Sequence, residues 1–256
     1  AIQLTAGRGR IAPAADAKAG RAVAPSAIPC FWSPDAKTRE LRVEEIETLI
    51  KDFGITAGIV KSAGIDAIEL HGHEGYLMDE FTTSLWNKRT DKYGGDFEGR
   101  LRFPLEIIKS IRSEAGPDFP IIYKFGANHH LEGGREVQES CEIAKRLQQA
   151  GVDALEVDAG CYETWYWAHP PTYMPPAPLL DEIEFLKKAV SIPVIAVGKL
   201  GYPQLAEEVL REGKADFIAL GRPLLADPDW PIKVKEGRLD DIRWCIGCHD
   251  GCMRRI

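Results

Sequence analysis

The sequence predicts an α/β protein folded as a (β/α)8 TIM barrel, with about six βα units present in this chain. From residue 40 onward, amphipathic helical segments alternate with short apolar strands, which is typical of a parallel sheet covered by helices. Junctions of the type Ala-Gly-x-Asp lead from helix to strand, and their glycines can end a helix in the left-handed conformation. The first strand lacks the G-x-G-x-x-G run of an open dinucleotide-binding sheet, so a barrel is favoured over a doubly wound sheet.

Each element follows from the spacing of apolar residues between turn residues. A strand is expected to open the chain at residues 1–5. Helices are expected at residues 43–63, 97–115, 135–150, 182–190 and 205–212. Further strands are expected at residues 65–70, 120–125, 154–157, 193–197 and 215–220.

The limits of the chain indicate a piece of a longer protein. The chain opens inside a strand, without Met or a leading helix, so we expect about two βα units before it. Residues 1–230 would then form a truncated barrel domain. Residues 231–256 would form a linker and the start of a metal-binding segment.

Residues 6–42 are a long stretch rich in Ala, Pro and Arg, without a periodic pattern. Structureless loops of this length are unusual in a compact domain and commonly serve as lids or binding loops. A poorly packed excursion from the barrel is the alternative, because the composition also suits a weakly ordered segment.

Composition argues against several classes of protein. An apolar fraction of 45% and a charged fraction of 28% are those of a globular domain. A net charge of −7 argues against a nucleic-acid-binding surface, and no apolar run approaches the ~20 residues of a membrane span. Six cysteines, three of them clustered, favour the reducing cytoplasm over a disulfide framework.

Cys245, Cys248 and Cys252 form a C-x2-C-x3-C cluster near the end of the chain. Three thiolates so close in sequence suit one metal centre, and a four-iron cluster takes four thiolates. We therefore expect an iron–sulfur (4Fe-4S) cluster whose fourth ligand lies outside this chain. A zinc knuckle that includes His249 is the alternative, although zinc sites usually have two separated ligand pairs. The remaining cysteines are expected to be ordinary buried or loop thiols: Cys30, Cys141 and Cys161.

The active site of a barrel enzyme lies at the carboxyl ends of the strands. Residues 70–77, LHGHEGYL, leave a predicted strand and place two imidazoles, a carboxylate and a phenol on one turn. Ionisable groups gathered at such a position are often functional. His71, His73, Glu74 and Tyr76 are therefore candidate catalytic residues.

Two later strands end in a glycine followed by a cation, at Gly198-Lys199 and Gly221-Arg222. Backbone amides without side chains, a cation and a nearby helix start favour phosphate binding. Barrels often hold phosphate after their last two strands. Gly198, Gly221 and Arg222 are therefore candidate phosphate-binding residues. Gln3 and Lys124 are further candidates because they lie near strand ends.

Taken together, these motifs resemble those of the old yellow enzyme family of flavin-dependent barrels. The sequence is similar to the iron–sulfur branch that contains 2-enoate reductases, 2,4-dienoyl-CoA reductases and bile-acid-inducible NADH:flavin oxidoreductases. The motifs that carry the resemblance span nearly the whole chain. They are EEI at 44–46, ELHGHEGYL at 69–77, NKRTDKYGG at 87–95 with Arg100, ALGRPL at 219–224 and CIGC at 245–248.

The resemblance implies that FMN binds in the barrel. Gln3 would bond to the pyrimidine edge of the flavin, and Lys124 would supply the cation near N1 and O2 where the family usually has Arg. The ribityl phosphate would lie on Gly198, Gly221 and Arg222.

The resemblance also implies a route for electrons. NAD(P)H would be the donor, acting through FAD in a C-terminal domain that lies outside this chain. The 4Fe-4S cluster would relay the electrons to FMN. Residues 87–95 and Arg100 would brace a loop rather than touch substrate.

For catalysis, the resemblance implies reduction of an activated C=C bond by a flavin hydride and a proton. Tyr76 matches the family's proton donor, and a phenol with a pKa near ~10 stays protonated at neutral pH. His71 matches one of two residues that hold the activating carbonyl oxygen. The second is ordinarily His or Asn and here is Glu74, whose carboxylate would repel an enolate unless protonated, turned away or paired. His73 would be a substitute, and His169 in an aromatic loop would line the pocket or be an ordinary satisfied histidine.

We therefore expect an NAD(P)H-dependent ene-reductase acting on an α,β-unsaturated acid, CoA thioester or ketone. The nearest alternative is an amine dehydrogenase or demethylase of the same branch, although amine oxidation needs no proton donor such as Tyr76. A non-catalytic, zinc-stabilised barrel scaffold is the alternative from another class. The expected partner is a small enoate or enone, with no nucleic acid and no membrane.

Overall fold

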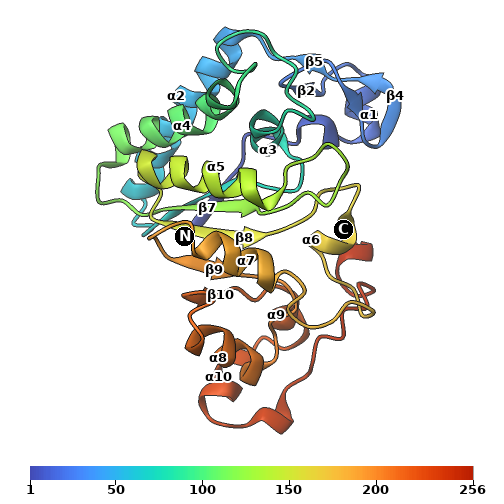
Figure 1. Ribbon diagram of the computed structural model, residues 1–256, viewed down its shortest axis with the longest axis vertical. Helices are drawn as coiled ribbons and strands as arrows, with labels where there is room; N and C mark the ends of the chain where they lie inside the picture. The colour runs from blue at the N-terminus through green and yellow to red at the C-terminus, as the bar shows by residue number, and fades with distance from the viewer. Residues whose placement is uncertain (256) are drawn as a thin grey trace.

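A computed structural model describes residues 1–255, in which six parallel strands form one sheet (Figure 1). The spatial order of the strands follows the chain, as in a barrel. Within the described residues, β1 and β10 form the edges of the sheet, each pairing with a single neighbour. The strands are β1 (Ile2–Leu4), β6 (Ile68–Gly72), β7 (Ile121–Gly126), β8 (Ala154–Asp158), β9 (Val194–Ala196) and β10 (Phe217–Ile218).

The predicted helices connect these strands, with bounds close to those expected. The helix predicted at 97–115 agrees with the structure at both ends. It begins at Phe97 because Asp96 caps it by accepting a hydrogen bond from the Gly99 amide at 2.8 Å. The helix predicted at 205–212 begins earlier, since Pro203 suits the first helical turn. The helices of the βα units are α2 (Val43–Ser62), α4 (Phe97–Ala115), α5 (Val137–Ala150), α7 (Leu180–Lys187) and α8 (Pro203–Arg211).

Glycines end α2, α5 and α8, as the junctions predicted. Gly64, Gly151 and Gly213 have φ angles of 76°, 104° and 70°. Glycine adopts these left-handed conformations without the steric cost of a Cβ atom. The chain can therefore turn at once from each helix toward the next strand.

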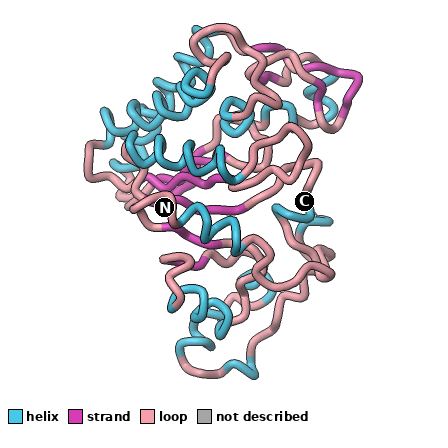
Figure 2. The backbone as a smooth tube through the Cα atoms, viewed as in Figure 1, coloured by secondary structure: helices cyan, strands magenta, loops and turns pink. Residues whose placement is uncertain are grey.

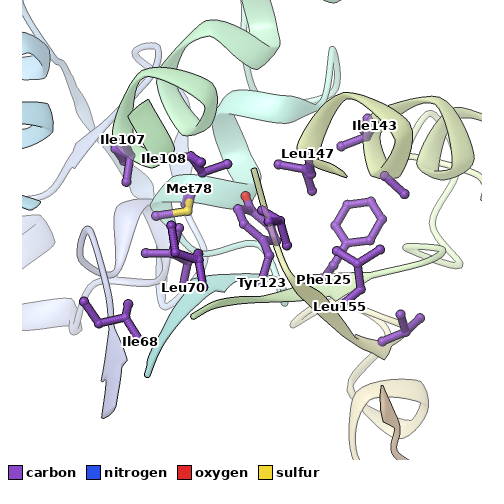
Figure 3. Packing of buried hydrophobic residues seen from close by; sticks show 14 of the residues in the cluster. Ile68, Leu70, Met78, Ile107, Ile108, Tyr123, Phe125, Ile143, Leu147 and Leu155 are labelled. Carbon is purple, nitrogen blue, oxygen red and sulfur yellow. The ribbon is translucent and has the colours of Figure 1, made fainter. Parts of the chain in front are cut away.

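The sheet has an apolar side and a polar side. Leu70, Tyr123 and Leu155 are register neighbours on β6, β7 and β8, and they are almost completely buried on the side that carries α4 and α5 (Figure 3). Burial of a large apolar side chain contributes about 1.5–3 kcal/mol. Because side chains alternate along a strand, the next register row faces the opposite side, which is the interior of a barrel. That row is polar: His71, Lys124 and Glu156.

Residues 6–42 are ordered, so the expectation of a structureless loop was wrong. They contain two small sheets, β2 (Val23–Ala24) with β5 (Arg39–Glu40) and β3 (Pro29–Cys30) with β4 (Ser33–Lys37), visible as the strands remote from the main sheet (Figure 2). The stretch also contains η1 (Gly9–Ile11) and α1 (Ala14–Lys18). Small buried residues form a core of its own, which sequence periodicity does not reveal: Ala12, Ala17, Ala22 and Cys30.

The loop at 87–95 braces this N-terminal excursion, as the resemblance implied. Arg89 is buried and donates hydrogen bonds to the carbonyl oxygens of Pro25 at 2.9 Å and Leu41 at 2.6 Å. Asn87 donates to the carbonyl oxygens of Phe81 and Tyr93, each at 2.8 Å. The excursion is thus tied to the barrel through buried polar contacts.

The remaining helices are short. They are α3 (Leu77–Thr82), α6 (Trp165–Ala168), α9 (Arg222–Ala226), α10 (Trp230–Lys235), η2 (Leu239–Asp241) and η3 (Met253–Arg255). α6 and the end of the chain lie beyond the carboxyl ends of the strands (Figure 1). In the part of the chain that the structure describes, no helix is both long and apolar enough to cross a bilayer.

Candidate active site

The carboxyl ends of β6, β7 and β8 bring most of the predicted catalytic residues together. His71 lies inside β6, which extends to Gly72, so the prediction that it stands on the following turn was wrong. The strand continues because His71 and Gly72 pair with Lys124 and Phe125 of β7. His73, Glu74 and Tyr76 follow on the turn that leads into α3.

The turn at 73–76 is held in an unusual backbone conformation. Glu74 and Gly75 have φ angles of 58° and 77°, and a non-glycine residue in this region costs free energy unless its surroundings fix it. The Gly75 amide donates to Asp79 Oδ2 at 2.8 Å. Asp79 is fully buried and pairs with Arg135 at 2.9 Å and with His129 at 3.1 Å. This buried network fixes the backbone that presents Tyr76.

Three ionisable groups form a chain across the turn. The Nε2 atoms of His71 and His73 are 3.1 Å apart, and His73 Nδ1 lies 2.5 Å from Asp158 Oδ2. Burial opposes the charged form of His73, but the carboxylates of Asp158 and Glu74 outweigh it and raise its pKa. Burial and the charge of His73 lower the pKa of His71 to about 3. His73 therefore holds a proton more readily than His71, which is neutral at physiological pH.

Of the three states considered for Glu74 (protonated, turned away or paired), the structure shows the paired one. Its Oε1 atom lies 3.1 Å from His169 Nε2 and 3.7 Å from His73 Nδ1. Burial disfavours the charged carboxylate, yet the histidines outweigh that cost and lower its pKa to about 2. His169 is thus both a satisfied histidine and part of a cavity wall.

Tyr76 shares a hydrogen bond of 2.6 Å with the hydroxyl of Tyr162. Burial, followed by this hydrogen bond, raises the pKa of Tyr76 well above its ordinary value. The ring of His71 stands edge-on to the ring of Tyr76, with centroids 4.7 Å apart. The phenol therefore stays protonated at any physiological pH.

A cavity of 390 Å³ adjoins this cluster at the ends of β7, β9 and β10. Gly221 faces open space where a Cβ atom would stand, and Gly198 has a left-handed φ of 112°. The backbone is open at Gly221, whereas a Cβ atom at Gly198 would meet the Leu179 side chain at 3.0 Å. The predicted residues in the wall are Glu74, Lys124, His169, Gly198, Gly221 and Arg222.

The cations at this cavity have partners within the chain. Lys124 Nζ lies 2.5 Å from Glu156 Oε1. Arg222 donates to the carbonyl oxygen of Pro170 at 2.9 Å and contacts His249 at 2.8 Å, and Lys199 donates to the carbonyl oxygen of Pro171 at 2.9 Å. The loop after β8 and the cysteine loop are therefore both tied to the cavity.

Gln3 does not line this cavity. Its side chain donates to Glu69 Oε2 at 3.0 Å on the polar side of the sheet, where β1 pairs with β6. Burial and the neighbouring Glu156 raise the pKa of Glu69 to about 7. Gln3 is thus the predicted flavin contact that lies apart from the others.

The three clustered cysteines lie on an irregular segment beside the cavity. Gly247 approaches the backbone at Pro171 and Thr172, and Thr172 Oγ1 donates to the Ile246 carbonyl oxygen at 2.7 Å. Within the described residues, one group of three possible metal-ligand atoms lies within 4.8 Å of one another, and it consists of His73, Glu74 and Asp158 rather than the cysteines. The remaining cysteines are buried thiols, as predicted.

Sequence reasoning missed three residues of this site. Asp158 lies one residue past the predicted strand at 154–157, so the strand-end rule had a signal for it. Tyr162 belongs to an aromatic loop in which sequence alone gives no reason to select one ring. Asp79 had no sequence signal, because only the fold places it under the Gly75 amide.

These features define a parallel barrel protein with a ligand site at the carboxyl ends of its strands. The chain belongs to the NADH:flavin oxidoreductase / NADH oxidase family, whose profile matches residues 1–241. The resemblance to old yellow enzymes and their enoate reductase branch is confirmed, as is the barrel fold. Membership implies FMN as the bound flavin and NAD(P)H as its reductant.

Relatives of known function are longer than this chain. It is 43% identical to the cinnamate reductase of Clostridium sporogenes over all of its residues and 40% of that protein. It is 47% identical to an NADH oxidase of Thermoanaerobacter brockii over 90% of this chain and 35% of that one. The chain thus spans less than half the length of both proteins.

Solved structures show the same relationship. A 2-naphthoyl-CoA reductase in complex with 2-naphthoyl-CoA gives a TM-score of 0.85 at 35% identity, covering 90% of this chain and 35% of that chain. The histamine dehydrogenase of Rhizobium sp. 4-9 gives a TM-score of 0.85 at 30% identity, covering 96% and 36%.

Proposed function

We propose that this chain is the flavin-barrel part of an NAD(P)H-dependent oxidoreductase that reduces an activated C=C bond. The observation that carries the proposal is Tyr76, a phenol with a raised pKa beside a neutral imidazole. Saturation of a C=C bond needs a hydride at one carbon and a proton at the other. A phenol that never ionises at neutral pH is suited to give that proton.

FMN fits the cavity at β7, β9 and β10. Open space over Gly221 and the left-handed Gly198 suit a phosphate lying against backbone amides, with Arg222 at the same wall. Lys124 would face the pyrimidine edge and favour the anionic reduced flavin. Gln3 lies outside this cavity, and it would contact the flavin only if its side chain moved away from Glu69. When bound, the reduced flavin supplies the hydride.

His71 would hold the activating oxygen of the substrate. A doubly protonated His73 would direct one proton toward Asp158 and the other toward His71 Nε2. His71 then carries its own proton on Nδ1, a buried atom without a hydrogen-bond partner among the described residues. An unpartnered buried donor costs free energy unless a ligand satisfies it. A carbonyl or enolate oxygen would do so.

Tyr76 would protonate the α-carbon, and Tyr162 would orient its hydroxyl through their shared hydrogen bond. Glu74 would act indirectly, because its pairing with His169 fixes that ring at the cavity wall. His73 would act as the charged neighbour that keeps His71 neutral. These roles assign one function to each group on the turn.

Cys245, Cys248 and Cys252 would bind three corners of a 4Fe-4S cluster, with a fourth thiolate from outside this chain. Thiolates are the donors that such clusters take, and the loop lies next to the cavity proposed for FMN. In the whole protein, the cluster would relay electrons from NAD(P)H and FAD to FMN. We divide the chain accordingly into a barrel domain at 1–230 and a cluster segment from 231. We also propose a cytoplasmic protein whose substrate is a small enoate or enone.

The test is an anaerobic visible spectrum of the protein that contains this chain, before and after NAD(P)H and then cinnamate or crotonate. A spectrum of flavin plus cluster that bleaches with the nucleotide and recovers with the enoate is expected. A colourless protein, or one that holds zinc without iron or flavin, would sink the proposal.

An amine dehydrogenase is the second candidate, because the histamine dehydrogenase structure matches this chain as well as the naphthoyl-CoA reductase does. Flavin reduction by an amine, without nucleotide, would favour it. Tyr76 and its partner Tyr162 favour C=C reduction, since oxidation of a C–N bond needs no proton donor at carbon.

A further inference from the structure

We infer that Arg8 and Trp32 form a substrate subsite that binds the carboxylate and the aromatic group of an aryl-substituted unsaturated acid. This inference rests on the proposed function and narrows its substrate class. Its starting point is a second cavity, of 560 Å³, which Tyr76 helps to line. Residues of the N-terminal excursion and the two tyrosines form its wall, among them Arg8, Ile11, Trp32, Tyr76 and Tyr162.

The cavity is held beside Tyr76 by the backbone. The Leu77 amide donates to the Gly7 carbonyl oxygen at 3.3 Å. This hydrogen bond holds the backbone before Arg8 beside the backbone after Tyr76. Gly9 is packed against the buried Glu80, whose Oε1 accepts from the Arg10 amide at 2.7 Å. Positions 7–10 therefore form a fixed wall of the site rather than a mobile loop.

Arg8 is exposed, and it is the arginine of the excursion for which the structure describes no protein partner. Arg10 pairs with Glu163, Arg21 with Asp16 and Arg39 with Glu45, at 2.6–2.8 Å. Within the described residues, Arg8 makes no ion pair and no side-chain hydrogen bond. A guanidinium presents paired donors that match a carboxylate, and such pairs are stronger than neutral hydrogen bonds. An acid group of the substrate would supply the missing partner.

Acidic groups near this cavity do not already neutralise Arg8. Glu163 is bonded to Arg10 through both oxygens. Burial raises the pKa of Glu80 well above its usual range, and its Oε1 atom already accepts a hydrogen bond from the Arg10 amide. Glu74 is charged but pairs with His169. An incoming carboxylate would therefore face one uncompensated positive charge.

Trp32 supplies the apolar part of the subsite. Its side chain is 56% exposed, although its ring stands edge-on to Phe31 at 4.8 Å and to Tyr162 at 5.9 Å. Phe31 and Tyr162 also contact each other, at 5.3 Å between centroids. Three rings thus form a rigid aromatic wall with one face open, which suits the ring of a substrate.

The subsite explains how an ionised acid could be reduced. The reduced flavin would give a hydride to the β-carbon and Tyr76 a proton to the α-carbon. The C=C π bond breaks, two C–H bonds form, and the flavin is oxidised. Negative charge would build toward the carboxylate during this step, and the Arg8 cation would stabilise it.

The test compares binding of cinnamate and cinnamamide to the oxidised holoprotein, followed by tryptophan fluorescence and equilibrium dialysis. Arg8→Gln is expected to raise the Kd of cinnamate about tenfold to a hundredfold. The Kd of cinnamamide should remain nearly unchanged, because it carries no charge. Arg21→Gln is the matched control, since Arg21 lies in the same excursion but pairs at the surface.

A second variant examines the aromatic end. Trp32→Ala should weaken cinnamate binding about tenfold and leave binding of crotonate, which lacks a ring, nearly unaffected. Trp32 is half exposed, so its removal leaves no buried cavity.

Equal binding of cinnamate by wild type and Arg8→Gln would overturn the inference. The binding measurements need no turnover, so they separate the two proposals. Charge-selective binding without flavin reoxidation would support the subsite and contradict the ene-reductase proposal. Reoxidation by cinnamate at equal KM in both proteins would support the ene-reductase and remove Arg8 from the site.

Discussion

The Tyr76 turn and the cysteine loop lie at the same end of the sheet, yet the chain holds them in opposite ways. Asp79, which fixes the turn, is fully buried, and its partner Arg135 is 1% exposed. In the cysteine loop, Cys248 is exposed, and the ion pair between Asp250 and Arg254 leaves both side chains more than half exposed. The loop is tied to the barrel through Thr172 and Arg222.

The difference indicates which geometry this chain sets by itself. Buried charges must be matched by partners in the fold, so the placement of Tyr76 is built into the packing of α3 against the excursion. Metal ligands are commonly ordered by the metal that they bind. We therefore expect the Tyr76 turn to be rigid without cofactors, and the conformation of the cysteine loop to depend on its cluster.

The largest effect on the rate of enoate reduction is expected from Tyr76, the proposed proton donor. Tyr76→Phe removes the proton donor and keeps the ring, so reoxidation of the flavin by an enoate should slow about 10²–10⁴-fold. Reduction of the flavin by NAD(P)H should not change, because it does not involve this proton. Stopped-flow measurement of both half-reactions checks the prediction. Equal slowing of both would instead indicate that Tyr76 supports the flavin site.

The buried network beneath the turn comes next. Asp79→Leu leaves the Arg135 charge buried without a carboxylate partner, a change that costs about 3 kcal/mol or more. Amide exchange in peptides covering residues 73–82 should then speed up about a hundredfold. Asp250→Leu is the matched change in the cysteine loop, where an exposed pair is lost and exchange at the turn should stay the same.

If Asp79→Leu left exchange at the turn unchanged, the turn would not depend on that network. The contrast between the two regions would then have to be explained by the backbone alone.

A smaller, pH-dependent effect is expected from Glu74. Its lowered pKa contributes stability that is present above the unfolded value near ~4.3 and is lost as pH falls through about 2. Glu74→Gln should therefore reduce the free energy of unfolding by about 2 kcal/mol at neutral pH, and the difference from wild type should shrink below pH ~4. Urea unfolding at several pH values checks this. Glu142→Gln, at an exposed pair, should show a much weaker pH trend, because solvent screens that pair.

The smallest effect on the barrel is expected from the cysteines. Cys248→Ser should lower the iron content of the protein, because a cluster ligand is lost. Exchange at residues 73–82 should change by no more than about 0.5 kcal/mol, because the buried pair of Asp79 and Arg135 fixes the turn. Loss of protection at the turn would show that the cluster and the acid site are coupled. Unchanged iron content would exclude Cys248 as a ligand.

The order of the six main strands and of the helices between them could be predicted from the sequence alone, whereas the small strands and helices of residues 6–42 could not. Alternating apolar segments and left-handed glycines such as Gly64 and Gly151 are local signals, and they do not depend on how the elements pack together. The same local logic identified residues 70–77 and the two glycines after the late strands, because strand ends meet at one edge of a parallel sheet. The cysteine cluster was visible for the same reason, since its spacing lies within one short segment.

Tertiary structure decided the partners of these residues. Nothing in the order of residues tells that Tyr162 meets Tyr76, that Asp158 meets His73, or that Asp79 lies under Gly75. Residues 6–42 have no periodic pattern because small side chains fill their core and distant carbonyls satisfy Arg89. Burial and charge pairing set the pKa values of His71 and Glu74, and both depend on residues far apart in the chain. The chemistry of the site is therefore a property of the fold, while its location is already present in the sequence.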